Sequence, residues 1–224
     1  MKLPLAALAL ALAALASTAA AAQNPPALAP ALPPRITYSK SFRGSVPSFV
    51  EITVQRDGAA FFEVIQQPGQ PPDKMEFHAA KALVERIFAL AAQLHDFSGP
   101  ELEAKTKVGY MGTKMLAYDD ATRHNQQTYN YSSRPAARDL TDIFERIAGS
   151  GEHAARLRHA VRYDRLGVVQ ELDGITRDWS EHQLLAPELL KPVLERVAND
   201  PDLMDIAHRR ALDLLTEMGA ARNR

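Results

Sequence analysis

The sequence predicts an α+β protein, with an antiparallel sheet, amphipathic helices on one face of that sheet, and a C-terminal helical region. Three observations predict this fold class. Apolar and polar residues alternate from residue 35 onward, which is typical of half-buried strands. The alternation changes to helical apolar spacing near Ala79 and again near Pro135, so strands followed by a helix occur twice. Only helical patterns follow residue 152.

The first 22 residues are typical of a secretory signal peptide. Lys2 supplies a positive charge, an apolar run of Leu and Ala extends from Leu5 to Ala16, and small residues lead to Ala22. The apolar run is shorter than the roughly 20 residues that a membrane-spanning helix needs. We therefore expect residues 1–22 to be a cleaved signal peptide. The product is then exported to the periplasm or the extracellular space, with no transmembrane segment after cleavage.

A proline-rich stretch follows over residues 23–34. Proline fixes φ and lacks a backbone donor, so this stretch is predicted to be an extended tether. It argues against the alternative of a buried N-terminal helix, because it would detach such a helix from any core. About 200 residues then remain, enough for one large or two small cores. Those cores form without disulfides, since the chain contains no Cys.

The α+β domain is predicted to span residues 35–148. In its first unit, the Asp57-Gly58 pair separates two apolar runs, which indicates a β-hairpin because a primed turn requires positive φ. The second unit repeats the order of strands and helix over a shorter stretch. The predicted elements are a strand marked by Ile36, Tyr38 and Phe42, strands over residues 50–55 and 61–65, a short strand at Met75 and Phe77, a helix from Ala79 to Leu94, strands over residues 108–118 and 126–131, and a helix starting near Pro135.

We expect Gly149-Ser150-Gly151 to end that helix and to act as a hinge. It differs from a Gly-x-Ser-x-Gly nucleophile turn, which needs a preceding strand and another glycine spacing. Residues 152–219 then form the C-terminal helical region, either as a small subdomain or as braces packed on the sheet. Its last helix is expected to run from Asp202 to Met218, because Asp200-Pro201 is a favourable N-cap and first-position pair.

Charge and motif content argue against several classes of protein. The 26 basic and 27 acidic residues lack the excess of positive charge that nucleic-acid binding requires, so we expect no nucleic-acid partner. No two of the seven histidines have the i, i+4 spacing of helical metal ligands, and no phosphate-binding glycine motif occurs. Without Cys there is no structural zinc site of the usual kind. The sequence therefore predicts no metal, no cofactor, no catalytic residue, and histidines scattered over the surface.

Three tyrosines of the second unit are candidate binding residues. Tyr118, Tyr129 and Tyr131 can share one face of the sheet, because alternate residues of a strand do so. Tyrosines on an open face form a recognition surface at low entropic cost. The alternative is that they are cross-strand packing pairs beneath a helix.

Three arginines are a second candidate binding group. Arg158, Arg162 and Arg165 have i, i+4, i+7 spacing, so they form one stripe if the helix is continuous. Such a row can hold a phosphate or an acidic partner. The alternative is a solvated face in which these arginines pair with acids such as Asp164 and Glu171.

The first predicted hairpin carries a distinctive sequence. Ser45-Val46-Pro47-Ser48-Phe49 leads into an alternating strand that ends at Val54, and Asp57-Gly58 follows. This segment resembles the opening hairpin of an uncharacterised family of exported bacterial α+β domains, in which a Ser/Cys-x-Pro-x-aromatic step precedes an alternating strand and an Asp-Gly turn. The resemblance implies the fold and no activity, and Ser45 in place of Cys implies no redox role. Similar secreted bacterial proteins also share the stretches Tyr110–Lys114, Asn130–Ser132 and Arg162–Gly167, which extends the resemblance over residues 35–218.

Three hypotheses about function follow. The first is a non-enzymatic extracytoplasmic binding or interaction module, whose partner is unknown and could be another envelope or secreted protein. The second is a hydrolase-type enzyme whose site is assembled from distant loops. The third is an inhibitor-like protein that docks through an open face carrying the three candidate tyrosines. The lack of a catalytic motif favours the first.

Overall fold

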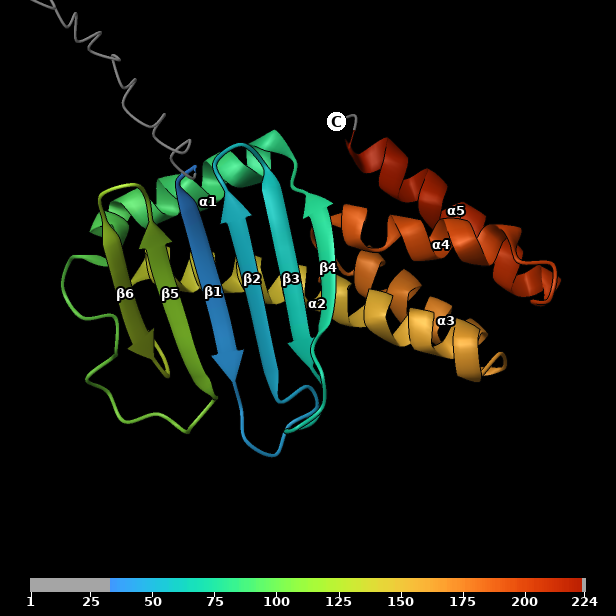
Figure 1. The fold of residues 1–224 in the computed structure, drawn as a ribbon, viewed down its shortest axis with the longest axis horizontal. Helices are drawn as coiled ribbons and strands as arrows, with labels where there is room; N and C mark the ends of the chain where they lie inside the picture. Colours follow the sequence, from blue (N-terminus) through green and yellow to red (C-terminus); the bar gives the residue numbers. More distant parts are fainter. Residues whose placement is uncertain (1–32, 223–224) are drawn as a thin grey trace, which may run out of the picture. The chain divides into compact units, whose positions relative to one another are not determined.

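Six strands form one antiparallel sheet in the computed structural model, which describes residues 33–222 (Figure 1). The strand order is β4-β3-β2-β1-β5-β6, so the first four strands form a meander and β5 pairs with the remaining edge of β1. The predicted signal peptide over residues 1–22 lies outside the described residues, as does the tether apart from Pro33 and Pro34. The strands are β1 (Arg35–Ser41), β2 (Phe49–Gln55), β3 (Ala59–Ile65), β4 (Asp73–His78), β5 (Thr113–Asp119) and β6 (His124–Tyr129).

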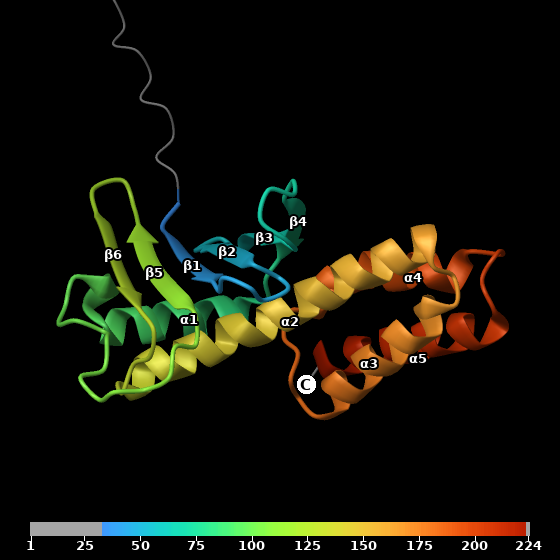
Figure 2. The ribbon, with the colours of Figure 1, turned by 90° about the horizontal axis from the view of Figure 1, so that it is seen from below.

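Helices α1 and α2 cover one face of this sheet (Figure 2). The other α-helices pack with the C-terminal half of α2 as a helical region. The predicted α+β fold, with helices on one face and a C-terminal helical region, is therefore confirmed. Within residues 33–222, none of the helices is both long and apolar enough to cross a membrane. The helical elements are α1 (Lys81–Gln93), η1 (His95–Phe97), α2 (Pro135–Tyr163), α3 (Gly167–Ser180), η2 (Pro187–Leu189), α4 (Lys191–Asn199) and α5 (Asp205–Arg222).

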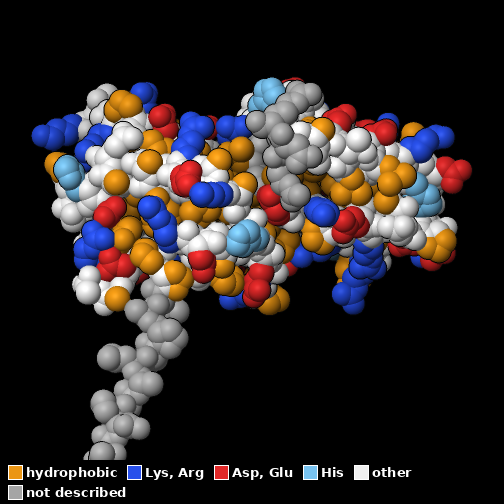
Figure 3. All heavy atoms as spheres, turned by 90° about the horizontal axis from the view of Figure 1, so that it is seen from above, with side chains coloured by type: hydrophobic (Ala, Val, Ile, Leu, Met, Phe, Trp, Pro, Cys, Tyr) orange, Lys and Arg blue, Asp and Glu red, His pale blue; other side chains and the backbone are white. Residues whose placement is uncertain are grey.

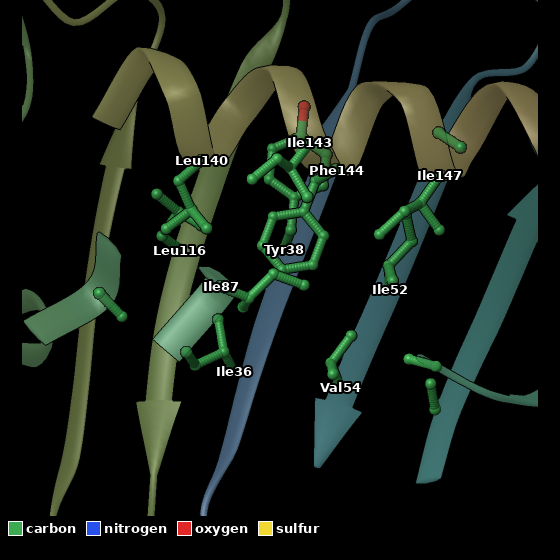
Figure 4. Close-up of a cluster of buried hydrophobic side chains, with 14 of the residues drawn as sticks. Ile36, Tyr38, Ile52, Val54, Ile87, Leu116, Leu140, Ile143, Phe144 and Ile147 are labelled. Carbon is green, nitrogen blue, oxygen red and sulfur yellow. The ribbon is translucent and has the colours of Figure 1, made fainter. Parts of the chain in front are cut away.

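The core between the sheet and its two helices is built from alternate strand positions (Figure 4). Ile36 and Tyr38 of β1 are fully buried, and the register places Tyr38 beside Ile52 of β2 and Leu116 of β5. The Tyr38 ring stacks on that of Phe144 in α2, with 5.2 Å between centroids. Full burial of a large apolar side chain contributes about 1.5–3 kcal/mol. Each of these buried side chains therefore stabilises the packing of α2 on the sheet.

The prediction that Gly149-Ser150-Gly151 ends the helix is wrong, because α2 runs through it without interruption. These small residues allow close packing. A Cβ at Gly151 would lie 2.5 Å from the ring of Phe62 in β3, so only glycine lets the helix approach the sheet this closely. The Ser150 hydroxyl donates a hydrogen bond to the carbonyl oxygen of Leu185, which ties the segment after α3 to α2.

Helix α2 takes part in two cores. Its N-terminal half packs against the sheet through residues such as Ile143 and Ile147. Its C-terminal half packs against α3, α4 and α5, where Leu157 meets a cluster that includes Leu172 and Leu194. The expected boundary between an α+β domain ending at 148 and a helical region starting at 152 therefore falls inside one continuous helix, and the described residues 33–222 belong to one compact unit.

Two predicted element boundaries are also wrong. Strand β5 begins at Thr113 and not at 108, because Gly112 has a φ of +96° and turns the chain beside β1. Helix α5 begins at Asp205 and not at Asp202. The reason is that the Asp200 carboxylate accepts a hydrogen bond from the Asp202 amide and its carbonyl accepts one from Leu203, which closes a turn ahead of the helix.

The connection after α1 contains a left-handed turn. His95, Asp96 and Phe97 all have positive φ, between 48° and 62°, which is rare for three successive residues with side chains. The Gln127 side-chain amide on β6 donates to the carbonyl of Phe97, and the Asn125 amide donates to that of Asp96. Burial of Phe97 further offsets the strain. Side chains of β6 thus hold a turn that the local sequence does not favour.

Candidate functional site

A cleft of about 880 Å³ lies between α2 and α3 and extends to the β3–β4 loop. Small residues on both helices leave room for this cleft, namely Ala155, Ala160, Gly167 and Gly174. Charged and amide side chains of both helices, of the turn between them, of the β3–β4 loop and of the start of β4 form its walls. These are Gln66, Asp73, His153, Arg156, His159, Asp164, Gln170, Glu171, Asp173, Arg177 and Asp178.

His153 lies at the floor of the cleft, and its side chain is 7 % exposed. Its Nδ1 is 2.6 Å from Oε1 of Glu171, and its Nε2 is 2.9 Å from Oδ2 of Asp178. Glu171 and Asp178 are seven residues apart on α3, which places them two turns apart on the same face. A Cβ at Gly174, between them, would lie 3.4 Å from the imidazole, so glycine there leaves room for the ring.

Each of the two carboxylates also accepts a hydrogen bond from an arginine. The Arg156 Nε donates to the same Glu171 oxygen at 3.0 Å, and one of its Nη atoms lies 2.9 Å from Nδ1 of His153. The Arg177 Nε donates to Oδ1 of Asp178 at 3.0 Å. Both carboxylates therefore contact the imidazole of His153, and each also accepts a hydrogen bond from a guanidinium.

These contacts shift the pKa values of both carboxyl groups. Burial disfavours the charged form of Glu171, but the hydrogen bond from His153 and the charge of Arg156 outweigh it and lower the pKa of Glu171. Burial likewise opposes ionisation of Asp178, yet the hydrogen bonds from His153 and Arg177 lower the pKa of Asp178. Both groups are therefore carboxylates at neutral pH, and both ring nitrogens of His153 face an acceptor.

The imidazole of His153 is held by a carboxylate at each ring nitrogen. A histidine that acts as a general base needs a free ring nitrogen within reach of the substrate, and both nitrogens of His153 are occupied by carboxylates. Among the described residues that line the cleft there is also no Ser, Thr or Tyr hydroxyl to act as a nucleophile. In addition, no group of three His, Asp or Glu within residues 33–222 is arranged to hold a metal ion.

A second, smaller pocket of about 250 Å³ lies between the β1–β2 loop and α2. Glu145 of α2 accepts a hydrogen bond from Lys40 at 2.9 Å and lies 3.4 Å from the hydroxyl of Tyr38. Burial, and after it the charge of Glu145, raises the pKa of Tyr38. Burial also raises the pKa of Glu152, which lines the same pocket, although Arg156 partly opposes the shift. This pocket therefore brings together titratable groups from distant segments.

The predicted open tyrosine face is wrong. Tyr118 and Tyr129 lie on the face of the sheet that α1 and α2 cover, and both are buried. The Tyr129 hydroxyl is 2.7 Å from that of Thr141 in α2, and the Tyr118 hydroxyl donates to Asp120. Tyr131 follows β6 and is half-buried. The alternative of packing beneath a helix is correct for Tyr118 and Tyr129, and docking through this face is not possible.

The predicted arginine stripe is not formed. Helix α2 ends at Tyr163, so Arg165 lies beyond it. Arg158 pairs with Asp73 of β4, while Arg165 pairs with Asp202 in the turn before α5. Arg162 lies over the ring of Tyr163 at 5.1 Å. The alternative of pairing with acids is correct for Arg158 and Arg165, but their partners are Asp73 and Asp202.

The functional residues that the sequence did not reveal are those around His153. The expectation of surface histidines is wrong here, because His153 is buried. The sequence holds one signal, since Glu171 and Asp178 share the i, i+7 spacing of one helical face. That signal becomes informative only when α2 is known to continue past Gly151 and to pack against α3.

No protein-family model matches the chain, and no curated protein is significantly similar to it. Its function is therefore inferred from the residues described above.

Proposed function

We propose that this protein is a non-enzymatic binding module, exported from the cell, whose α2–α3 cleft binds a short charged segment of another exported protein. The cleft volume of about 880 Å³ suits a ligand of limited size better than a folded surface. The observation that carries the proposal is the contact of both His153 ring nitrogens with carboxylates, which fixes the cleft floor and leaves neither nitrogen of His153 free.

The lining of the cleft indicates the chemistry of the ligand. Exposed groups of both signs border it, including Arg177 with 66 % and Asp173 with 54 % of the side chain exposed. Gln66 and Gln170 add amide donors and acceptors, which match those of a peptide backbone. A segment that carries one acidic and one basic side chain can therefore pair with these two groups on the α3 wall.

The charges predict weak, salt-sensitive binding. Exposed ion pairs contribute about 0–1 kcal/mol each, and salt screens them over about 10 Å at 0.1 M. Acidic and basic side chains are also interspersed over the face of the molecule in Figure 3, so charge alone does not direct a ligand to one region of that face. We expect dissociation constants in the micromolar range that rise with ionic strength.

Selection from a random peptide library, followed by calorimetry with the selected peptide, tests this proposal. Arg177→Ala is expected to weaken binding roughly five-fold, about 1 kcal/mol. Arg209→Ala on α5, a matched change of an exposed arginine away from the cleft, is expected to leave the affinity unchanged. Equal binding by wild type and Arg177→Ala at low salt would contradict the proposal.

A hydrolase-type enzyme is the second candidate, and the pocket beneath the β1–β2 loop favours it. There, Tyr38 and Lys40 from β1 meet Glu145 and Glu152 from α2. The raised pKa of Glu152 is what a general acid requires. A panel of fluorogenic esters, glycosides and peptides tests this candidate. Turnover that disappears in Glu152→Gln, with an unchanged circular dichroism spectrum, would establish the enzyme and replace the binding proposal.

A further inference from the structure

Two neighbouring loops at one end of the sheet carry an exposed apolar patch. The β1–β2 loop contributes Phe42 and Val46, and the loop before β5 contributes Val108, Tyr110 and Met111. We call these five residues the loop patch. Val46 is 69 % and Tyr110 59 % exposed, and the loop patch holds five of the ten exposed large apolar side chains among the described residues. Such grouping marks an interaction surface, whereas single exposed apolar residues do not.

The two loops are held together. The rings of Phe42 and Tyr110 meet edge to face at 5.5 Å. Gly112 allows this approach, since its φ is +96° and a Cβ there would lie 3.1 Å from the carbonyl oxygen of Ser41. Figure 1 shows both loops at the same end of the sheet, beyond the end of β1 and the start of β5.

Hydrogen bonds to residues at the ends of β5 and β6 fix the second loop. The Asn130 side chain accepts from the amide of Met111 at 2.6 Å and donates to the carbonyl of Gly109 at 3.0 Å. The Tyr110 hydroxyl is 2.9 Å from that of Thr113. The loop patch is therefore preorganised, which lowers the entropic cost of binding a partner.

Unpaired basic side chains lie in the same two loops as the loop patch. Arg43 lies in the first loop and Lys105 and Lys107 in the second, all three are exposed, and none forms an ion pair with another residue in the range 33–222. The acids of the second loop are Glu101, at its far end, and Glu103, which turns inward to accept a hydrogen bond from the Asn130 amide. Apolar and aromatic side chains bordered by uncommitted cations match the interface of an anionic lipid bilayer.

We propose that the loop patch docks this protein reversibly on an anionic lipid bilayer. Five apolar side chains on two loops give a shallow contact that needs support from the basic side chains. Each basic side chain close to an anionic surface strengthens binding roughly five-fold. A folded protein partner would also cover apolar residues, but it leaves three neighbouring cations without counter-charge unless it is acidic. The proposal does not depend on the function assigned to the α2–α3 cleft.

Vesicle co-sedimentation tests the proposal. The chain from Gln23 onward is used, because it retains all described residues and lacks the apolar run of the predicted signal peptide. With vesicles containing phosphatidylglycerol at 0.1 M salt, wild type is expected to sediment. Val46→Ser/Met111→Ser is expected to weaken partitioning at least ten-fold. Lys105→Gln/Lys107→Gln is expected to weaken it roughly twenty-five-fold, and only on the anionic vesicles.

The matched control is Leu166→Ser, which removes a side chain that is 79 % exposed in the α2–α3 turn, outside the loop patch. It is expected to partition like wild type. A Tyr110→Trp reporter should show a blue shift of its fluorescence with anionic vesicles. Wild type that stays in the supernatant, an equal loss in Leu166→Ser, or capture of a protein through the loop patch without vesicle binding would each overturn the proposal.

Discussion

The imidazole of His153 on α2 lies 2.6 Å from the carboxylate of Glu171 on α3, so one side chain links the two helices that border the cleft. The same ring reaches Asp178 with its other nitrogen. Removal of the imidazole leaves two partly buried carboxylates with one partner fewer each, and an unsatisfied buried polar group is costly.

We therefore expect His153→Ala to destabilise the protein by about 1–3 kcal/mol. Urea denaturation followed by circular dichroism measures the free energy of unfolding. The control is His159→Ala, since His159 is exposed on the same helix. It is expected to change the stability by less than about 0.5 kcal/mol. Equal free energies of unfolding in the two variants would show that the contacts of His153 with Glu171 and Asp178 contribute nothing to stability.

The free energy of unfolding should fall in acid because of the contact between His153 and Glu171. The pKa of Glu171 is lower in the folded protein than in the unfolded chain, where it is about 4.3. A depressed folded pKa adds stability that is fully present above about 4.3 and is lost as the pH falls through the folded pKa. The difference in stability between wild type and Glu171→Gln should therefore shrink between pH 7 and pH 3. A constant difference in urea midpoints over that range would contradict this prediction.

Alanine substitutions at two helical glycines test whether Gly151 serves close packing or flexibility. A Cβ at Gly151 would meet the Phe62 ring at 2.5 Å, so Gly151→Ala is expected to destabilise by about 1–3 kcal/mol despite the higher helix propensity of Ala. A Cβ at Gly219 on α5 would meet no neighbouring side chain within 4 Å, and Gly219→Ala is expected to stabilise by about 0.4–1 kcal/mol. Thermal unfolding of both variants compares them. A hinge at Gly151 would instead tolerate alanine.

The left-handed turn makes a prediction at His95, which is exposed and has a φ of +56°. A β-branched residue is strongly disfavoured there, while glycine adopts positive φ freely. His95→Val is therefore expected to be less stable than His95→Gly by about 1–2 kcal/mol. Chemical denaturation of the pair measures the difference. Equal stability of the two variants would mean that the turn is not left-handed in solution.

Much of the sheet and its covering helices could be predicted from the sequence. The alternation at Val50, Ile52 and Val54 has a period that only a half-buried strand explains, and the Asp57-Gly58 pair fixes the hairpin that follows. These signals are local, and burial on one face enforces them. The predicted change of period near Ala79 and Pro135 likewise corresponds to α1 and α2.

The candidate site could not be predicted, because its contacts join segments that are distant in sequence. Gly151 looks like a helix breaker until the ring of Phe62, 89 positions earlier in the chain, is known to lie against it. If the helix ends at Gly151, His153 has no facing partner. The prediction for Tyr118 and Tyr129 is wrong for a related reason, since alternation shows that residues share a face but not which face the helices cover.

Blocking the cleft tests the central claim of binding between α2 and α3 most directly. Gln170→Trp places a large side chain at an exposed position of α3 that lines the cleft, and it leaves His153 and its partners in place. Calorimetry with the library-selected peptide should show binding weakened at least ten-fold, about 1.4 kcal/mol, while the control Glu217→Trp on α5 binds like wild type. Unchanged affinity in Gln170→Trp would contradict the account.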